Sequence, residues 1–330
     1  MAAPPGLAST RRTRFVCISD THNSTVKLPK GDVLVHAGDL TNQGTYAELA
    51  RAVAWLEKAD FECKIVIAGN HDITLDNAFY AQHGTSFHNQ APQSPGDCRA
   101  LLESSPSITY LCHESATVRL KSKTGPHTEF TVFGSPFSPR NGTWAFSYGP
   151  SGNGSSASAP GTSLASDQTA TVGERIWADI PPDADIVVTH TPPFLHCDWS
   201  AVHGRAMGCR GLRLALRRVQ PLLAVCGHVH EGRGAQWVRW DATGDGASVE
   251  CWDDPGRGTD NKRMSIVRVT SRPFNQVPGG PGAAAADHGD GRVTCIVNCA
   301  ITATNYPHIG GKQLNKPIVV DMMLPVWDGP

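Results

Sequence analysis

Residues 15–22 read FVCISDTH, a short apolar run that ends two positions before an aspartate, with a histidine two positions further on. The apolar run predicts a buried strand, and extended backbone beyond it can turn both Asp20 and His22 toward one ion. The same arrangement recurs after four more apolar runs, with the motifs Gly38-Asp39, Gly69-Asn70-His71-Asp72, Thr189-His190 and Gly227-His228-Val229-His230. Five such motifs predict a parallel or mixed sheet whose strand ends deliver ligands to one edge, where α/β sheets bind their ligands.

The segments around these motifs alternate between strands and helices, which indicates the α/β class. A helix is predicted after the second strand, because Thr45 and Glu48 have the spacing of a capping box. Residues 117–120 and 130–133 alternate in polarity and predict two antiparallel strands. Further strands are predicted at residues 186–189, 222–226, 264–269 and 293–299, and further helices at 97–105, 172–178 and 208–219.

Composition favours one globular domain. The chain has 330 residues, of which 40% are hydrophobic and 18% charged, so it can form a large core. No linker separates two complete cores, and we therefore expect a flexible N-terminus at residues 1–13 followed by a single domain over 14–330. Stretches rich in Gly, Ser, Ala and Pro near residues 149–171 and 278–291 predict flexible insertions.

Several classes of protein are disfavoured. The formal net charge of −1 gives no basic surface for long nucleic acid, and no apolar stretch is long enough to span a membrane. The first residues lack the apolar region of a signal peptide. The ten cysteines contain no CxxC pair, which indicates free thiols in a reducing compartment. We expect a cytoplasmic protein whose partner is a small molecule, with neither long nucleic acid nor a membrane.

The polar residues of the motifs form a mixed set of oxygen and nitrogen donors. Asp39 can bridge two ions with its two carboxylate oxygens, Asn70 offers an amide oxygen, and His190, His228 and His230 offer imidazole nitrogens. Such a set suits divalent Mn, Fe or Zn, and it lacks the cysteines of a closed structural site. Two dications carry a charge of +4 against −2 from Asp20 and Asp39, so the site should attract phosphate.

His71 and Asp72 have a different predicted role. His71 follows Asn70 directly and is better placed to face a substrate than a metal, where it can protonate the leaving oxygen of a phosphate ester. Asp72 is predicted to fix the orientation of His71, and the alternative is a simple helix N-cap. These two residues are the catalytic candidates.

Together these motifs resemble the calcineurin-like metallophosphoesterase superfamily, over roughly residues 14–300. The resemblance implies a two-sheet β-sandwich flanked by α-helices. It also implies two divalent metal ions, most often Mn, with Fe, Zn or Mg as alternatives. The first ion would be held by Asp20, His22, Asp39 and His230, and the second by Asp39, Asn70, His190 and His228, with His71 as the catalytic acid.

Finer features resemble one subgroup, the small metallophosphoesterase-domain proteins of mammalian brain and fungi. They include Gly134-Ser135-Pro136, Trp144-Ala145-Phe146, His190-Thr191-Pro192-Pro193 and Asn298-Cys299-Ala300. The resemblance implies hydrolysis of small phosphodiesters or cyclic nucleotides by direct attack of metal-bound hydroxide. A phosphomonoesterase acting on a protein, nucleotide or metabolite phosphate is the alternative within enzymes, and a non-catalytic metal- or nucleotide-binding scaffold is the alternative outside them.

Other polar residues have plainer interpretations. His36 is expected to pack or to support a ligand from inside the second strand. The arginines between residues 205 and 218 are expected to form a solvated helix face, with steering of an anionic substrate as the alternative. His196, Asp198 and His203 border the substrate pocket in one interpretation, and Trp144 with Phe146 either stack on a base or pack in the core.

Overall fold

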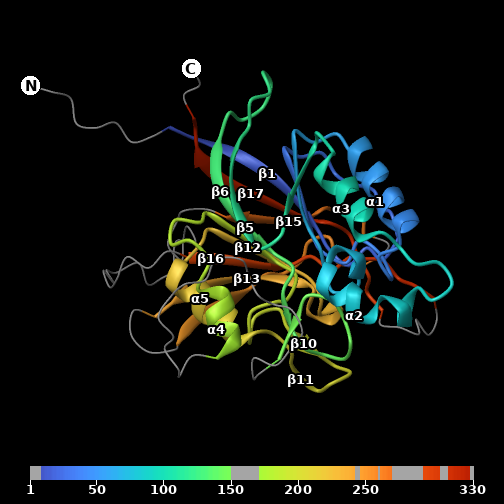
Figure 1. Cartoon of the computed structure of the whole chain (residues 1–330). Coiled ribbons are helices and arrows are strands. Elements are labelled where there is room, and N and C mark those ends of the chain that lie inside the picture. The colour runs from blue at the N-terminus through green and yellow to red at the C-terminus, as the bar shows by residue number, and fades with distance from the viewer. Residues whose placement is uncertain are drawn as a thin grey trace, which may run out of the picture.

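The computed structural model describes residues 9–149, 171–241, 246–258, 261–269, 293–304 and 311–327. The two stretches predicted as flexible insertions, near 149–171 and 278–291, fall almost entirely outside the described residues. Two large sheets lie face to face at the centre of the molecule (Figure 1). This is the two-sheet α/β sandwich that the family resemblance implied, and that prediction is confirmed.

The first sheet carries three of the five motif strands. Its strands lie in the order β15 (Ser265–Val269), β17 (Ile318–Pro325), β1 (Thr10–Ile18), β2 (Val33–Ala37), β3 (Cys63–Ile67) and β4 (Ile108–Leu111). From β1 to β4 every neighbouring pair is parallel, whereas β17 runs antiparallel to β1. The carboxyl ends of β1, β2 and β3 therefore meet at one edge of the sheet.

The second sheet carries the other two motif strands. Its order is β14 (Ala247–Cys251), β13 (Gly234–Trp240), β16 (Val293–Asn298), β12 (Leu223–Cys226), β9 (Ile186–Thr189), β6 (Glu129–Ser135) and β5 (Glu114–Arg119). The central strands β16, β12, β9 and β6 are parallel, and the expected antiparallel pairing of β5 with β6 is confirmed. The interpretation of the five motif strands as one sheet is wrong, because the ligands come from the edges of two facing sheets.

Alternation along each strand divides the core into three layers. In β1, Phe15 and Cys17 face the second sheet, while Val16 and Ile18 face the helices on the outer side. Helices α1 (Tyr46–Lys58), α2 (Asn77–Phe87) and α3 (Pro95–Glu103) flank the first sheet, and α4 (Val172–Trp177) and α5 (Arg210–Val219) flank the second (Figure 1). Short elements complete the described chain: the 3₁₀ turns η1 (Ile73–Leu75) and η2 (His230–Gly232), and the paired strands β7 (Ser138–Pro139) with β8 (Ser147–Tyr148) and β10 (Trp199–Ser200) with β11 (Arg205–Ala206).

Helix α1 begins as its sequence predicts. The Thr45 hydroxyl accepts from the Glu48 N–H at 3.2 Å, and the Glu48 carboxylate accepts from the Thr45 N–H at 2.9 Å, so the capping box is confirmed. Leu49, Val53 and Leu56 form its buried face. The helix thereby fixes the connection between β2 and β3, the two strands that present Asp39 and Asn70.

The N-terminal boundary differs from the expectation. Residues 10–13 were expected in a flexible segment, but β1 already begins at Thr10 and pairs with β17 as far as Pro325. The Arg14 guanidinium donates to both Asp321 carboxylate oxygens at 2.7 Å, which fixes this register. Among the described helices, none is both long and apolar enough to cross a bilayer.

Candidate metal centre

The metal-binding candidates lie in the loops directly after the strands of both sheets. Four of them adopt left-handed backbone that non-glycine residues rarely occupy: Asp20 at φ 52°, His22 at 43°, Asp39 at 55° and His228 at 66°. Each such residue costs about 1–3 kcal/mol and persists only where its surroundings enforce it. Such strain is concentrated at functional sites, and here it is concentrated at the predicted ligands.

Glycines allow the loops to approach one another closely. A Cβ on Gly227 would collide with the Ser19 hydroxyl and the Asp20 carboxylate, and a Cβ on Gly69 would collide with Asp39. Gly227 therefore lets its loop in the second sheet contact the loop after β1 in the first sheet, and Gly69 lets the loops after β2 and β3 contact each other.

The first donor set contains the four residues that the resemblance assigned to the first metal. His230 Nε2 lies 3.4 Å from Asp20 Oδ1 and 3.4 Å from His22 Nε2. The His22 Nδ1–H donates to the Thr41 carbonyl at 3.1 Å, which leaves Nε2 free to bind a metal. Asp39 Oδ2 lies 3.6 Å from this nitrogen.

The second donor set shares Asp39 with the first. His190 Nε2 lies 3.4 Å from Asp39 Oδ2 and 2.9 Å from Asn70 Oδ1. Its Nδ1 contacts the Ala37 carbonyl at 2.9 Å, which again directs Nε2 into the site. The His228 ring lies 4.9 Å from the His190 ring, measured between ring centroids. The structure therefore brings all seven predicted metal ligands together.

The donor atoms lie close enough together to hold a cation. The donor atoms of Asp20, His22 and His230 all lie within 4.8 Å of one another, and so do those of Asp20, Asp39 and His190. Buried carboxylates and imidazoles this close together are stable only when paired or bound to metal.

Electrostatics leaves these residues largely in their metal-binding protonation states. Burial alone would raise the pKa of the Asp20 and Asp39 carboxyl groups. His230 instead lowers the pKa of Asp20 below its usual value. His190 and His71 hold the pKa of Asp39 well below its usual value. Burial lowers the pKa of His22 to about 4. Two ionised carboxylates and a neutral imidazole at pH 7 are the forms that coordinate a cation.

The two histidines of the second set differ in their pKa values. Burial, together with the neighbouring His190, lowers the pKa of His228 to about 3. Burial also opposes the charge on His190, but Asp39 and Asp20 raise the pKa of this histidine to about 9. A cation that binds here would take the place of the His190 proton between the two carboxylates.

Comparison with known proteins gives the family. The model of the calcineurin-like phosphoesterase family matches residues 13–232. The chain belongs to this family. Calcineurin-like phosphoesterases are metal-dependent phosphoric ester hydrolases with dinuclear centres, and the two donor sets described above are of the kind such a centre needs.

Relatives identify the subgroup within the calcineurin-like family. Human metallophosphoesterase domain-containing protein 1 is 36% identical over 241 residues, which are 70% of this chain and 63% of that protein. A UPF0046 protein of Caenorhabditis elegans is 33% identical over 233 residues, which are 67% of this chain and 52% of that protein. The predicted resemblance to the small metallophosphoesterase-domain subgroup is confirmed, although the matches span less than two thirds of each of these two relatives.

Two further matches complete the comparison. A protein of Emericella nidulans named probable rhamnogalacturonate lyase C is 38% identical over 230 residues, but the match covers 69% of this chain and only 18% of that protein. The solved structure of purple acid phosphatase PPD1 from yellow lupin has a TM-score of 0.40 and 12% identity, covering 96% of this chain and 55% of that one. The family assignment rests on the sequence matches.

His71 lies beside the metal ligands and is held from two sides. Its Nδ1 contacts the Asn42 carbonyl at 2.8 Å, and its ring lies 3.9 Å from the Trp144 ring at an angle of 31°. A ring nitrogen of His71 also lies within 4.8 Å of donor atoms of His22 and Asp39. Both proton donation to a substrate and metal ligation are therefore within its reach.

Asp72 has a different role from the one expected. Its carboxylate accepts from the backbone N–H groups of Leu40 at 3.2 Å, Thr41 at 2.9 Å and Gly69 at 2.9 Å, and from the Thr41 hydroxyl at 2.7 Å. Burial, followed by repulsion from Asp39, raises the pKa of Asp72 to about 6. The prediction that Asp72 orients His71 is wrong, as is the N-cap alternative, because this side chain joins the loop after β2 to the loop after β3.

The supporting residues are only partly those the sequence suggested. His36 Nε2 lies 3.0 Å from the Thr21 hydroxyl, between the ligands Asp20 and His22, so it supports a ligand loop as expected. His196 and Asp198 are buried and bond within the protein, to Gln236 and to the backbone N–H groups of Leu195 and Gly208. These bonds give both residues a structural role in the loop after His190.

Two of the arginines after residue 205 make contacts within the protein. Arg218 donates to the carbonyls of Trp177, Ala178 and Ile180, which joins α5 to the end of α4. The Arg210 guanidinium lies 4.0 Å from the centre of the Phe194 ring. These contacts favour the plainer interpretation of a helix face over substrate steering.

Sequence reasoning assigned no role to the C-terminal part of the site. The Thr302 hydroxyl donates to the Asp20 carbonyl at 2.7 Å, and the Lys312 ammonium donates to the carbonyls of Thr21 and His22 at 3.2 and 2.7 Å. The buried Asn298 donates to both sides of His228. Of these residues only Asn298 lies in a quoted motif, and its spacing from the other motifs revealed no ligand pattern.

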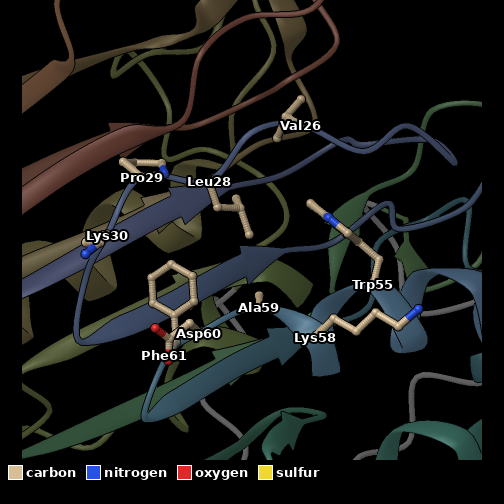
Figure 2. Close-up of a pocket in the computed structure, with 9 residues that line it drawn as sticks. All are labelled: Val26, Leu28, Pro29, Lys30, Trp55, Lys58, Ala59, Asp60 and Phe61. Carbon is tan, nitrogen blue, oxygen red and sulfur yellow. The ribbon is translucent and has the colours of Figure 1, made fainter.

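A separate hollow of about 250 Å³ lies away from the ligands (Figure 2). Leu28, Trp55 and Phe61 form its apolar wall, and Lys58 lies at its edge. These residues belong to the end of α1 and to loops that lead into β2 and β3. The hollow therefore lies toward the amino ends of the strands, whereas the metal ligands follow their carboxyl ends.

Proposed function

We propose that this chain is a two-metal phosphodiesterase that hydrolyses small phosphodiesters or cyclic nucleotides, with Mn²⁺ as its usual metal. The observation that carries the proposal is the position of Asp39 Oδ2, which lies 3.6 Å from His22 Nε2 and 3.4 Å from His190 Nε2. One carboxylate oxygen thus faces both donor sets. This is the arrangement that a bridging ligand between two neighbouring cations requires.

The chain's own residues supply the geometry. Bound divalent metals would act as Lewis acids, activate water and neutralise charge as the ester is cleaved. Asp20, His22, Asp39 and His230 would hold one ion, and Asp39, Asn70, His190 and His228 the other. Two dications carry a charge of +4, and Asp20 and Asp39 contribute only −2. The centre therefore remains electropositive and attracts the phosphate group.

His71 provides the proton for the leaving group. The Asn42 carbonyl accepts from Nδ1–H, so the other ring nitrogen, Nε2, is the atom that can protonate an oxygen of the departing ester. The Trp144 ring packs against the imidazole at 3.9 Å and restricts its rotation. A fixed proton donor beside the metal centre lowers the barrier to leaving-group departure.

Charge near the centre favours diesters over monoesters. A monoester carries nearly two negative charges and usually needs cations beyond the metals. Within the described ranges, the Lys312 ammonium donates to two backbone carbonyls of the first ligand loop, and Arg233 pairs with Asp254 at 3.0 Å. These cations are already engaged by the protein, which suits a substrate with a single negative charge.

The donor set indicates the metal type, and the free cysteines indicate the cellular compartment. The mixed nitrogen and oxygen donors suit Mn²⁺, with Fe, Zn or Mg as substitutes. All ten cysteines are free, which suits the reducing cytoplasm. The partner we propose is a small phosphate ester, with neither long nucleic acid nor a membrane as a substrate.

The test is a metal-reconstituted assay across mono-, di- and cyclic phosphate esters. Bis-p-nitrophenyl phosphate should be hydrolysed in the presence of Mn²⁺ and not after chelation, with a kcat/KM above that for p-nitrophenyl phosphate at the same pH. Asp39→Asn should remove most turnover, whereas Asp60→Asn on the exposed surface should not. A higher kcat/KM for monoesters would favour a phosphomonoesterase, and nucleotide binding without turnover under several metals would favour a scaffold.

A further inference from the structure

Asn298 lies fully buried at the end of β16, beside the loop that carries His228 and His230. Its side-chain amide donates to the carbonyls of Val229 at 2.9 Å, Cys197 at 3.0 Å and Gly227 at 3.3 Å. Its Oδ1 accepts from the Ala300 N–H at 3.1 Å. Every polar atom of this side chain is therefore used to hold backbone.

Two of the three carbonyls belong to the residues on either side of His228. The His228 backbone has a φ of 66°, and its N–H donates to the Asp20 carboxylate at 3.0 and 3.1 Å. A residue in this conformation relaxes when its neighbours are released. The Asn298 amide holds both neighbours, so it holds the His228 ring where the second donor set needs it.

The same C-terminal segment also holds the other ligand loop. The Asp20 carbonyl accepts from the Thr302 N–H at 3.2 Å and from its hydroxyl at 2.7 Å, and the Ser19 carbonyl accepts from the Ile301 N–H at 2.8 Å. Residues 298–302 thus hold the backbone of two loops that come from different sheets. They lie beyond residue 232, where the match to the calcineurin-like family ends.

We propose that Asn298 is a positioning residue for the metal centre, and that loading of the metal near His228 depends on this C-terminal segment outside the family match. The inference rests on the metal centre of the proposed function but not on which ester is cleaved. Replacing an outer residue that orients metal ligands typically weakens metal binding by about 10- to 100-fold. Asn298→Ala should weaken one of the two Mn²⁺ sites by this factor and leave the other within about threefold.

The experiment is a Mn²⁺ titration by calorimetry, with metal content after dialysis, on full-length wild type, Asn298→Ala and Asn261→Ala. Asn261 is the matched control, because its amide also donates to backbone carbonyls, those of Pro255 at 2.7 Å and Arg257 at 3.3 Å, which belong neither to the ligand loops nor to residues 298–302. We expect two Mn²⁺ per chain for wild type and the control, and about one for Asn298→Ala. The visible spectrum of the Co²⁺-substituted proteins should change in parallel, because it reports the coordination of the ions directly.

Thermal unfolding, measured in chelator and again with Mn²⁺, separates an effect on metal binding from an effect on the stability of the fold. Asn298→Ala should show a smaller Mn²⁺-induced rise in Tm than wild type, whatever its Tm without metal. Two tightly bound Mn²⁺ and a wild-type Co²⁺ spectrum in this variant would overturn the inference while leaving the proposed function intact. Should the variant fail to fold, Thr302→Val tests the other half of the segment, with a weakened site at Asp20 expected and unchanged Mn²⁺ affinity contradicting the inference. A wild-type protein that binds no metal would contradict the proposed function itself.

Discussion

Asp72→Ala separates a structural role for this carboxylate from a catalytic one. The structure gives Asp72 four accepted hydrogen bonds, three of them from the backbone N–H groups of Leu40, Thr41 and Gly69. The Thr41 hydroxyl can turn toward the His71 carbonyl, 3.5 Å away, so its loss of a partner costs little. The three backbone donors have no such alternative in the described contacts.

The magnitude follows from those three donors. A buried N–H group without a partner costs about 1–3 kcal/mol, and water that enters the vacated space recovers part of this. We therefore expect Asp72→Ala to lower the free energy of unfolding by about 3–5 kcal/mol. Asp72→Asn keeps one acceptor oxygen and should lose about half as much.

The assay is urea unfolding of chelated protein, followed by metal analysis and diester turnover of the same variants. Chelation removes the contribution of bound metal, so the decrease in the free energy of unfolding reports only on the connection between the two loops. Metal content should also fall, because Leu40 and Gly69 adjoin the ligands Asp39 and Asn70. A loss below about 1 kcal/mol, with intact metal and a large drop in kcat, would refute this reasoning and restore Asp72 as an orienter of His71.

Two further predictions concern His71 and the ring that packs on it. His71→Ala should lower kcat by about 10²- to 10⁴-fold, the usual contribution of a positioned acid, with metal content unchanged. An equal loss of bound Mn²⁺, measured by metal analysis, would make His71 a ligand instead. Trp144→Ala should lower kcat about 10-fold, because a small misplacement of a catalytic group is costly, and Trp144→Phe should restore most of the rate. Steady-state kinetics on a small diester checks this, and a change confined to KM would point to substrate stacking on Trp144.

Strong local patterns explain what could be predicted of the fold. The β1 run Phe15–Ile18, the capping box at Thr45 and the antiparallel pair β5–β6 each depend on neighbours in sequence, and each matches the structure. The division into two sheets could not be derived from periodicity, because a buried parallel strand is apolar on both faces in either arrangement. It followed from the family resemblance alone.

Elements with weak signals were missed. Helix α2 buries only Phe79 and Gly84, so its sequence lacks an apolar face. Strand β17 contains Asp321 in an otherwise apolar run, and this residue is neutralised by Arg14, which is 307 positions away in the sequence. Partners this distant cannot be read from local sequence.

The candidate site was likewise predictable in part. The positions of Asp20, Asp39 and His190 at strand ends were predictable, because polar residues after buried strands meet at a sheet edge. The bonds of Asp72 and Asn298 were not, since a side chain that holds backbone carbonyls or N–H groups leaves no mark in its spacing. Their roles become visible only when the loops of both sheets are seen together.

Anomalous diffraction from crystals grown with Mn²⁺ tests the central claim most directly. Two peaks about 3.5–4 Å apart should lie on either side of the Asp39 carboxylate, one near His22 and His230 and the other near Asn70 and His190. A single peak, or peaks that share no ligand, would contradict the two-metal centre on which the proposed function depends.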